Sequence, residues 1–393
     1  MYIIHLGFSG FPTGNAAVQR VKSTFKAIKN AGYTPVIINK QSVHKKVNYN
    51  KRVNHFDDLI FIDTSPVLIK QDSFIKRNLN KAQGIINEFK FLCSKRKKIH
   101  SAIFYASSFY ELLYYRLLSR LFAFHLVIQY VEHRSSIPER DSFFTKINDK
   151  LFDRYCSNFC DGVIAISEFL KNEIHKKNQR LPILKIPAVC NFEDFETVEP
   201  ANFDFDYYLY CGTVYYVPVI EFVLSFFEKV RDQQIYQGKI IFIIGGGDKK
   251  NLSFIKDLFE KSRYKDDIIL QSNIPYDTLL SLYKSAELLI IPLRNNIQDI
   301  ARFPHKVSEY TASGRPLISS KIGELKHYFV NQESALLADE YNVDMYVNTV
   351  KRMKDEKIDL EEIGRKGHAI GYKNFHYLSH VENLKTFFSG LDS

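Results

Sequence analysis

Residues 301–324 read ARFPHKVSEYTASGRPLISSKIGE, and they follow shortly after the apolar run ELLIIPL. Proline suits the first helical position because its missing N–H would be unpaired there, so we expect a helix that begins at Pro304. Gly314, followed by Pro316, is typical of a helix end. A helix between ELLIIPL and PLISS predicts a buried parallel sheet whose strands are joined by helices.

The same alternation of short apolar runs and helical segments extends through the 393-residue chain. YIIHLGF, SAIFYAS, LVIQYVE and GVIAIS form a first series, and YYLYCG, KIIFIIGGG and ELLIIPL form a second. Residues 191–206 separate the two series and contain prolines and acidic clusters with little periodicity, which predicts a linker. The sequence therefore predicts the α/β class, with two Rossmann-like doubly wound domains, 1–195 and 205–371, facing each other across a cleft.

The predicted helix start has the properties of an anion site. Phe303 carries no side-chain acceptor and is a poor N-cap, so the N–H groups of His305, Lys306 and Val307 lack a local partner. Free N–H groups at a helix start, with Arg302 and Lys306 beside them, favour binding of a phosphate.

Glu309 lies about a turn and a half further along this helix. A carboxylate there can accept two hydrogen bonds from a vicinal diol such as a ribose, so the helix matches a nucleoside diphosphate. The alternative is a surface helix with charge pairs four residues apart.

The charge of the chain favours acidic partners. The formal net charge is +10 and the pI is about 9.1, as for proteins that bind nucleotides, phosphorylated acceptors or anionic lipid. Basic runs at 44–52 and 95–98 are either solvated segments or a surface that lies on anionic lipid. SFYELLYYRLLSRLFAF places Arg116 and Arg120 on one stripe, which fits a core helix with snorkelling arginines or a peripheral membrane helix. A nucleic-acid binder is disfavoured, because the basic residues lack aromatics interleaved at the spacing of a known module.

Other classes of protein are disfavoured by missing patterns. The chain has no uncharged apolar stretch of roughly 18 residues, so we expect no membrane span. MYIIHLGFSGF lacks a basic leader and a cleavage site, which predicts a cytoplasmic protein. The five cysteines follow no metal-binding spacing, and the D-x-D at 204–206 precedes a strand instead of following one. We therefore expect neither a metal ion nor a bound cofactor.

RFPHKVSEYTASGRPLIS, followed by Gly323 and Glu324, resembles the nucleotide-binding signature of the large retaining glycosyltransferase family with the GT-B fold, the family 4 group. This family includes many bacterial capsule and lipopolysaccharide enzymes. FPTGNAAVQRVKSTFKAIKNAGYTPVIIN, GVIAISEFLKNEI, KIPAVCNFEDF, IIGGGD and SNIPYDTLLSLYKSAELLIIPL add matches in the family's order. The resemblance implies a nucleotide-sugar donor, a saccharide or lipid-linked saccharide acceptor, retention at the anomeric carbon, and a final helix at 372–393 that packs on the N-terminal domain.

The resemblance also implies roles for individual residues. Glu309 would be the second glutamate of the family's E-x7-E motif and would contact the ribose, while the N–H groups at 305–307 would hold the distal phosphate. The remaining residues that we assign to the donor site share a place in loops or at strand ends: Gly14 and Asn15 opposite the diphosphate, His133 near the donor sugar, Ile274 and Tyr276 facing the base, and Gly212, Gly246 and Phe303 near the nucleotide.

Two features depart from the family's pattern. The first glutamate of E-x7-E is replaced by Ala301, and CGTVYYVPVIEF lacks the arginine and lysine that usually grip the diphosphate. We expect Arg302 and Lys306, with Arg294 as a weaker helper, to supply that charge and to stabilise the departing diphosphate. The alternative is a catalytically degenerate subunit that binds a sugar nucleotide and assists a partner enzyme. An epimerase or phosphorylase of the same fold lacks any positive residue signature.

Overall fold

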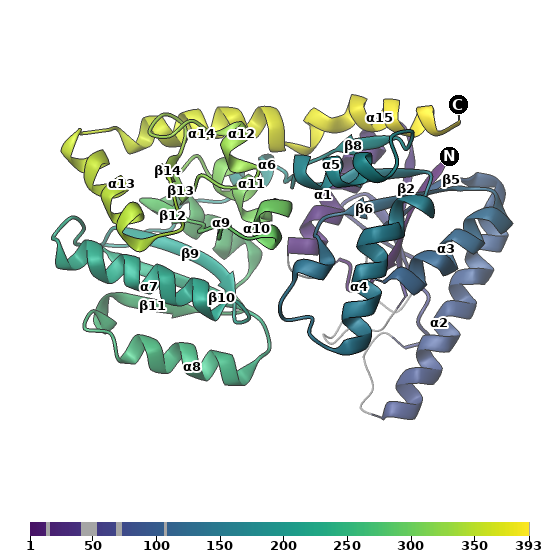
Figure 1. Ribbon diagram of the computed structural model, residues 1–393, viewed down its shortest axis with the longest axis horizontal. Coiled ribbons are helices and arrows are strands. Elements are labelled where there is room, and N and C mark those ends of the chain that lie inside the picture. The colour runs from purple at the N-terminus through teal and green to yellow at the C-terminus, as the bar shows by residue number, and fades with distance from the viewer. Residues whose placement is uncertain (13–15, 41–52, 68–72, 106–107, 393) are drawn as a thin grey trace. The chain divides into compact units, whose positions relative to one another are not determined.

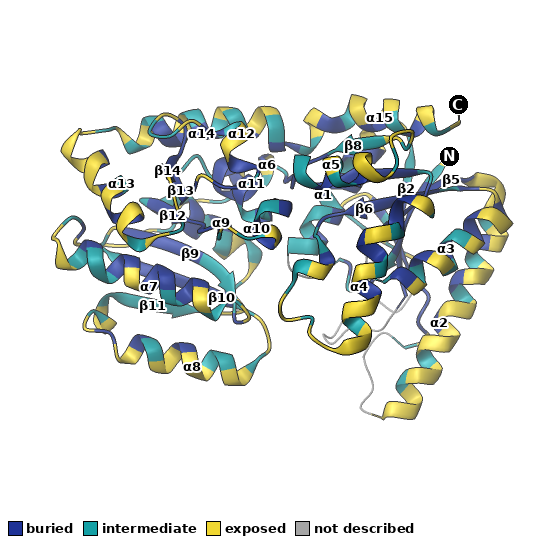
Figure 2. Cartoon of the chain, viewed as in Figure 1, coloured by how far each residue is buried: buried dark blue, intermediate teal, exposed yellow. Residues whose placement is uncertain are grey.

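The structure is a computed structural model, and it describes every residue except 13–15, 41–52, 68–72, 106–107 and 393 (Figure 1). The chain divides into two compact units. The N-terminal unit comprises Met1–Val189, Ala301–Phe303 and Tyr377–Ser393, and the C-terminal unit comprises Cys190–Ile300 and Pro304–His376. Figure 2 shows that the strands of each unit are mostly buried, whereas many outer helices expose one side.

The N-terminal unit is built on a sheet whose described strands follow the order β3-β4-β2-β1-β5-β6-β7-β8. Neighbouring strands are parallel except β3 and β4, which form an antiparallel pair. The strands are β1 Tyr2–Phe8, β2 Thr34–Asn39, β3 Val53–Phe56, β4 Leu59–Asp63, β5 Ile99–Tyr105, β6 His125–Tyr130, β7 Gly162–Ala165 and β8 Ile183–Lys185. The helices are α1 Ala16–Asn30, α2 Phe74–Lys95, α3 Phe109–Phe122, α4 Phe143–Tyr155, α5 Glu168–Lys177 and α15 Val381–Ser389.

The last helix, α15, belongs to the N-terminal unit. Its Leu384 and Phe388 are fully buried in the same apolar cluster as Ile3 and Val127. The Asp392 carboxylate that follows it lies 3.1 Å from His100 Nε2. Apolar burial therefore attaches the C-terminal end of the chain to the first sheet.

The C-terminal unit is built on a parallel sheet with the order β11-β10-β9-β12-β13-β14. The apolar run at β10 is buried without interruption from Ile240 to Ile244, as expected of a strand covered on both faces. The strands are β9 Tyr207–Thr213, β10 Lys239–Gly245, β11 Ile268–Gln271, β12 Leu288–Ile290, β13 Leu317–Ser320 and β14 Leu336–Ala338. The helices are α6 Glu193–Glu196, α7 Val217–Asp232, α8 Lys249–Glu260, α9 Tyr276–Ser285, α10 Ile297–Ala301, α11 His305–Ala312, α12 Leu325–Tyr328, α13 Val343–Asp355 and α14 Leu360–Phe375.

The boundary between the units differs from the predicted linker at 191–206. Cys190 donates its N–H to the Phe375 carbonyl at 3.0 Å, and the Phe192 ring packs against His376 with centroids 5.5 Å apart. His376 Nε2 lies 3.0 Å from Glu193 Oε2. These contacts to the end of α14 make residues 190–196 part of the C-terminal unit, and they keep 372–376 there as well.

In the described part of the chain, none of the helices combines the length and the apolar character needed to cross a bilayer.

Candidate functional site

Helix α11 spans His305–Ala312 and confirms the helix predicted from Pro304 and Gly314. Pro304 occupies the N-cap position and not the first helical position, because its ψ of 128° is extended. The side chain of the N-cap residue, Pro304, makes no capping hydrogen bond. Gly314 ends the helix with a φ of +74°, a conformation that glycine adopts without steric cost.

One of the three predicted phosphate donors is not free. The Val307 N–H donates to the Pro304 carbonyl at 3.0 Å, which closes a tight first turn. This N–H is therefore already engaged within the first turn, and its contact with a phosphate stays a prediction. The prediction now rests on the N–H groups of His305 and Lys306.

Glu309 lies in the interior of the C-terminal unit, where only 5% of its surface is exposed. The Tyr276 hydroxyl, from the first residue of α9, donates to Glu309 Oε1 at 3.1 Å. His305 Nε2 lies 3.4 Å from the same oxygen. Burial raises the pKa of Glu309, but His305, Lys306 and the Tyr276 hydroxyl outweigh it, so the pKa lies below its ordinary value. The site therefore holds a buried and ionised carboxylate.

Lys306 is directed toward the end of β9. It is half-buried, and its charge and hydrogen bond act on the thiol of Cys211, the residue before Gly212. Burial raises the pKa of Cys211, and Lys306 offsets part of that rise. An ammonium group thus lies near the carboxyl end of a central strand, where ligands bind in open α/β sheets.

The predicted glycines occupy the carboxyl ends of β9 and β10, which are paired strands. Gly246 has a φ of +117°, and a Cβ there would lie 2.7 Å from Val214 Cγ2. Gly212 pairs with Ile244 in the sheet, and a Cβ on it would lie 2.4 Å from the Tyr210 hydroxyl. Gly246 therefore requires glycine for the chain to turn at this edge of the sheet, and at Gly212 the absence of a Cβ leaves room for the Tyr210 ring.

The predicted base-facing residues Ile274 and Tyr276 lie at the start of α9, on either side of Pro275. Ile274 is half-buried. Tyr276 connects this helix start to α11 through Glu309. The structure therefore brings Tyr276, His305, Lys306 and Glu309 together within one unit.

The residues of the predicted clamp come from both units. Arg302 and Phe303 group with the N-terminal unit, and Lys306 belongs to the C-terminal unit. The Ser167 hydroxyl, in the N-terminal unit, donates to the Ala301 carbonyl. Arg294, the weaker helper, is engaged elsewhere, because its Nε donates to Asp299 Oδ2 at 2.8 Å.

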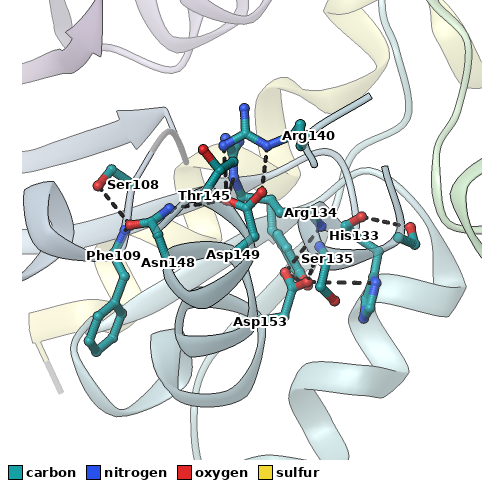
Figure 3. A network of polar contacts seen from close by, with 12 residues as sticks. Ser108, Phe109, His133, Arg134, Ser135, Arg140, Thr145, Asn148, Asp149 and Asp153 are labelled. Atoms are coloured by element: carbon teal, nitrogen blue, oxygen red, sulfur yellow. Dashed lines mark hydrogen bonds and ion pairs between the residues drawn. The ribbon is translucent and has the colours of Figure 1, made fainter. Parts of the chain in front are cut away.

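His133 follows β6 in the N-terminal unit and is half-buried. Its Nδ1 lies 3.6 Å from Asp153 Oδ2 on α4, and its carbonyl accepts a 2.7 Å hydrogen bond from the Ser136 hydroxyl (Figure 3). Asp153 also accepts the Ser135 N–H at 2.7 Å. The imidazole therefore stands beside a buried carboxylate that positions the following turn. Gly14 and Asn15 lie outside the described residues.

Sequence reasoning missed a charged cluster directly after His133. Arg134 and Arg140 both contact Asp149 of α4, at 3.3 Å for Arg134 Nε to Oδ1 and 2.9 Å for Arg140 Nη2 to Oδ1 (Figure 3). The only local signal is the spacing of Asp149 and Asp153, which places two carboxylates on one helix face. Arg134 lies in a short turn and Arg140 in the loop that follows it, so hydrophobic periodicity does not predict their positions.

In the part of the chain that the structure describes, no three His, Cys, Asp or Glu side chains gather as a metal site would require.

Comparison with known proteins bears on both units. Residues 191–369 match the family model for glycosyl transferases group 1. No curated protein matches the sequence. Among solved structures, sucrose-phosphate synthase from Thermosynechococcus elongatus is similar with a TM-score of 0.77 and 16% identity, over 100% of this chain and 99% of that chain.

Two further structures contain nucleotides. Anabaena HepE, solved in complex with UDP-glucose, has a TM-score of 0.65 and 12% identity, with 99% of this chain and 100% of that chain covered. The catalytic domain of starch synthase IV from Arabidopsis thaliana, bound to ADP and acarbose, has a TM-score of 0.67 and 12% identity over 99% of each chain. The chain therefore has the GT-B fold, and its residues 191–369 are similar to group 1 glycosyl transferases.

Proposed function

We propose that the protein is a glycosyltransferase that moves a sugar from a nucleotide-diphosphate donor to a saccharide or lipid-linked saccharide acceptor. The observation that carries this proposal is the buried, ionised Glu309, held by Tyr276 one turn inside a helix start that also presents Lys306. The carboxylate suits a ribose diol and the helix start suits the diphosphate. The similar structures that contain UDP-glucose or ADP support a donor of this class.

The chemistry of the site would be electrostatic. When the bond between the sugar and the diphosphate breaks, negative charge develops on the leaving phosphate. The His305 and Lys306 N–H groups and the Lys306 ammonium are fixed before the reaction, so they can stabilise that charge without reorganising. Arg302 would add to this charge if the N-terminal unit delivers it to the donor.

We further propose retention at the anomeric carbon and independence of a metal ion. The leaving phosphate would deprotonate the acceptor hydroxyl on the same face of the sugar, which requires no second carboxylate beside the sugar. His133 would bind the donor sugar from the N-terminal unit. Lys306 and the helix start would replace the charge that a metal ion supplies to the diphosphate in other transferases.

We also propose that the N-terminal unit works on an anionic membrane surface at the cytoplasmic face. Helix α3 exposes an apolar stripe, spaced three or four residues apart, made of Tyr110, Leu113, Leu117 and Leu121. Arg120 lies exposed beside this stripe. Exposed apolar side chains next to basic ones favour anionic lipid.

The other arginine of this helix has a different role. Arg116 Nη1 binds Asp161 at 2.7 Å, so it is an internal ion pair. Of the basic runs, 95–98 is mostly exposed, and 44–52 lies outside the described residues. Flotation with liposomes containing phosphatidylglycerol, at low salt, tests the membrane proposal. A protein that stays at the bottom of the gradient would contradict it.

The activity itself is tested with a panel of nucleotide sugars, first without acceptor and without metal. We expect one donor to bind and to release nucleoside diphosphate slowly by hydrolysis, and we expect EDTA to leave this release unchanged. Binding without release, even with lipid-linked acceptors present, would contradict transfer and favour the degenerate subunit. The absence of binding to every donor would contradict the assignment of Glu309 and α11.

A further inference from the structure

The N-terminal unit contains a cavity of about 350 Å³ whose lining begins at Arg134, the residue after His133. This cavity is formed by the turn at Arg134–Ser136, by the loop that follows it, and by one face of α4. Its charged lining residues are Arg134, Arg140, Lys146, Asp149 and Lys150. The proposed donor site in the C-terminal unit uses none of these residues.

The cavity has a surplus of positive charge. Four cations and one carboxylate line it, which gives 4 − 1 = +3. The carboxylate, Asp149, is 1% exposed and is already compensated by Arg134 and Arg140. Burial raises the pKa of Asp149, but the hydrogen bond from Arg140 and the charges of both arginines lower it below the ordinary value. Asp149 therefore orients the two guanidinium groups and does not repel a bound anion as a free carboxylate would.

The framework of the cavity is held by buried polar contacts. Asp153 accepts the Tyr130 hydroxyl at 2.9 Å, the Arg134 N–H at 3.2 Å and the Ser135 N–H at 2.7 Å. On the other side of α4, Asn148 Oδ1 accepts the Phe109 N–H at 2.9 Å, which ties α4 to the start of α3 (Figure 3). The turn and the helix are thus fixed before any ligand arrives, and fixed donors are what an anion site needs.

Two of the four cations are available to a ligand. Lys146 and Lys150 are exposed and lie four residues apart, on the face of α4 that lines the cavity. Neither lysine makes an ion pair with another residue in the described ranges of the chain. Arginine and lysine side chains around one cavity bind phosphate oxygens well, and the Ser135 hydroxyl in the same lining can donate as well.

We propose that this cavity binds a phosphate or diphosphate group of the acceptor, so that the acceptor is a phosphorylated saccharide. The inference rests on the proposed transferase function. A doubly charged phosphate would leave the cavity with a residual positive charge. The phosphate would lie next to His133, the residue immediately before Arg134, and would place the attached saccharide beside that imidazole.

The phosphate could belong to a soluble sugar phosphate or to a lipid-linked one. Phe143 and Phe144, in the first turn of α4, are 72% and 81% exposed. They precede Lys146 and Lys150 in the same helix and offer an apolar surface to a lipid tail. The test therefore includes both sources of the phosphate.

Phosphate binding is measured first, without any transfer. The full-length protein is saturated with the nucleoside diphosphate that it binds, so that α11 is occupied, and is then titrated with inorganic pyrophosphate. We expect Lys146→Ala/Lys150→Ala to weaken this binding at least tenfold. The matched control is Lys256→Ala/Lys261→Ala, which removes two exposed lysines from the region of α8 and should bind as the wild type does. Equal binding by both double variants would overturn the proposal.

Transfer is measured second, with a hexose 6-phosphate, a lipid-linked saccharide diphosphate in vesicles, and the unphosphorylated saccharide. We expect a preference for one phosphorylated acceptor, and we expect this preference to fall at least tenfold in Lys146→Ala/Lys150→Ala. Preference for the hexose phosphate would identify a soluble source, and preference for the vesicle substrate a lipid source. Equal use of the unphosphorylated saccharide would overturn the cavity's role. Failure of donor hydrolysis would contradict the transferase function separately, since the pyrophosphate titration does not depend on it.

Discussion

Replacing Lys306 by alanine should weaken the binding of a nucleoside diphosphate about 10- to 150-fold and leave the affinity for the free nucleoside near that of the wild type. Lys306 is half-buried and directed toward the end of β9, where Cys211 precedes Gly212. A phosphate held at the start of α11 would lie close to this ammonium group. The nucleoside would contact Tyr276 and Glu309 and not Lys306.

The magnitude follows from the burial of the lysine. Two unit charges 4 Å apart attract with about 4 kcal/mol at the effective dielectric constant of a protein surface, which is an upper limit. After desolvation and ordering, a hydrogen bond to a charged group contributes about 1.5–3 kcal/mol, and each 1.4 kcal/mol changes Kd tenfold. Lys306 also helps to keep Glu309 ionised, but burial and His305 act more strongly on the pKa of Glu309. The affinity for the nucleoside should therefore fall little in Lys306→Ala.

Isothermal titration calorimetry at fixed ionic strength measures these affinities for the nucleoside, its monophosphate and its diphosphate. Lys326→Ala removes an exposed lysine of α12 and serves as the matched control. Arg302→Ala tests whether the N-terminal unit adds to the clamp, and it should show a smaller loss confined to the diphosphate. Wild-type affinity in both Lys306→Ala and Arg302→Ala would refute the clamp. An equal loss for the nucleoside would show that Lys306 supports the fold and not the phosphate.

Three further changes have expected outcomes. Glu309→Gln should weaken the binding of the nucleoside and of its diphosphate alike, by about 1.5–3 kcal/mol, because the diol loses one charged acceptor. Calorimetry would contradict this if only the diphosphate bound more weakly. His5 is buried, and burial lowers its pKa to about 4. Because this imidazole takes up a proton in the unfolded chain before it does so in the folded one, the protein should lose about 3 kcal/mol of stability between pH 6.5 and 4. His5→Phe should make Tm fall less over this range, and parallel Tm profiles for the variant and the wild type would refute the prediction. Gly246→Ala should lower stability by about 1–3 kcal/mol because its φ is +117° and its Cβ would meet Val214, whereas Gly247→Ala, with open space around it, should melt as the wild type does.

Local sequence signals were sufficient for the parts of the fold that are defined by neighbouring residues. Pro304 and Gly314 delimit α11 to within one residue because helix ends are set by backbone geometry that those two residue types restrict. The consecutive apolar residues of β10 predicted a strand buried on both faces, and the two α/β series predicted two units. A resemblance spread through the chain predicted the GT-B fold and the position of α15.

At the start of α11, the expectation that three N–H groups lack a local partner differs from the structure at one of them. The sequence leaves the Val307 N–H without a partner, but the turn at Pro304 bends tightly enough for the Pro304 carbonyl to accept it. Arg294 was expected to serve a ligand, and it binds Asp299 instead, because the short helix α10 brings that carboxylate back to it.

Only the tertiary structure decided which charged groups meet. The boundary at Cys190 depends on a hydrogen bond to Phe375, far away in sequence, and the environment of Glu309 depends on the Tyr276 hydroxyl from another helix. The cavity lined by Arg134 and Lys150 combines a turn with a helix face, and the sequence pattern of each does not predict that they approach one another. The sequence by itself determines elements and buried faces because hydrophobic periodicity acts along the chain. Polar side chains from distant segments meet only when those segments pack together. Burial of apolar surface drives that packing, and the charged residues on the same segments are brought close as a consequence.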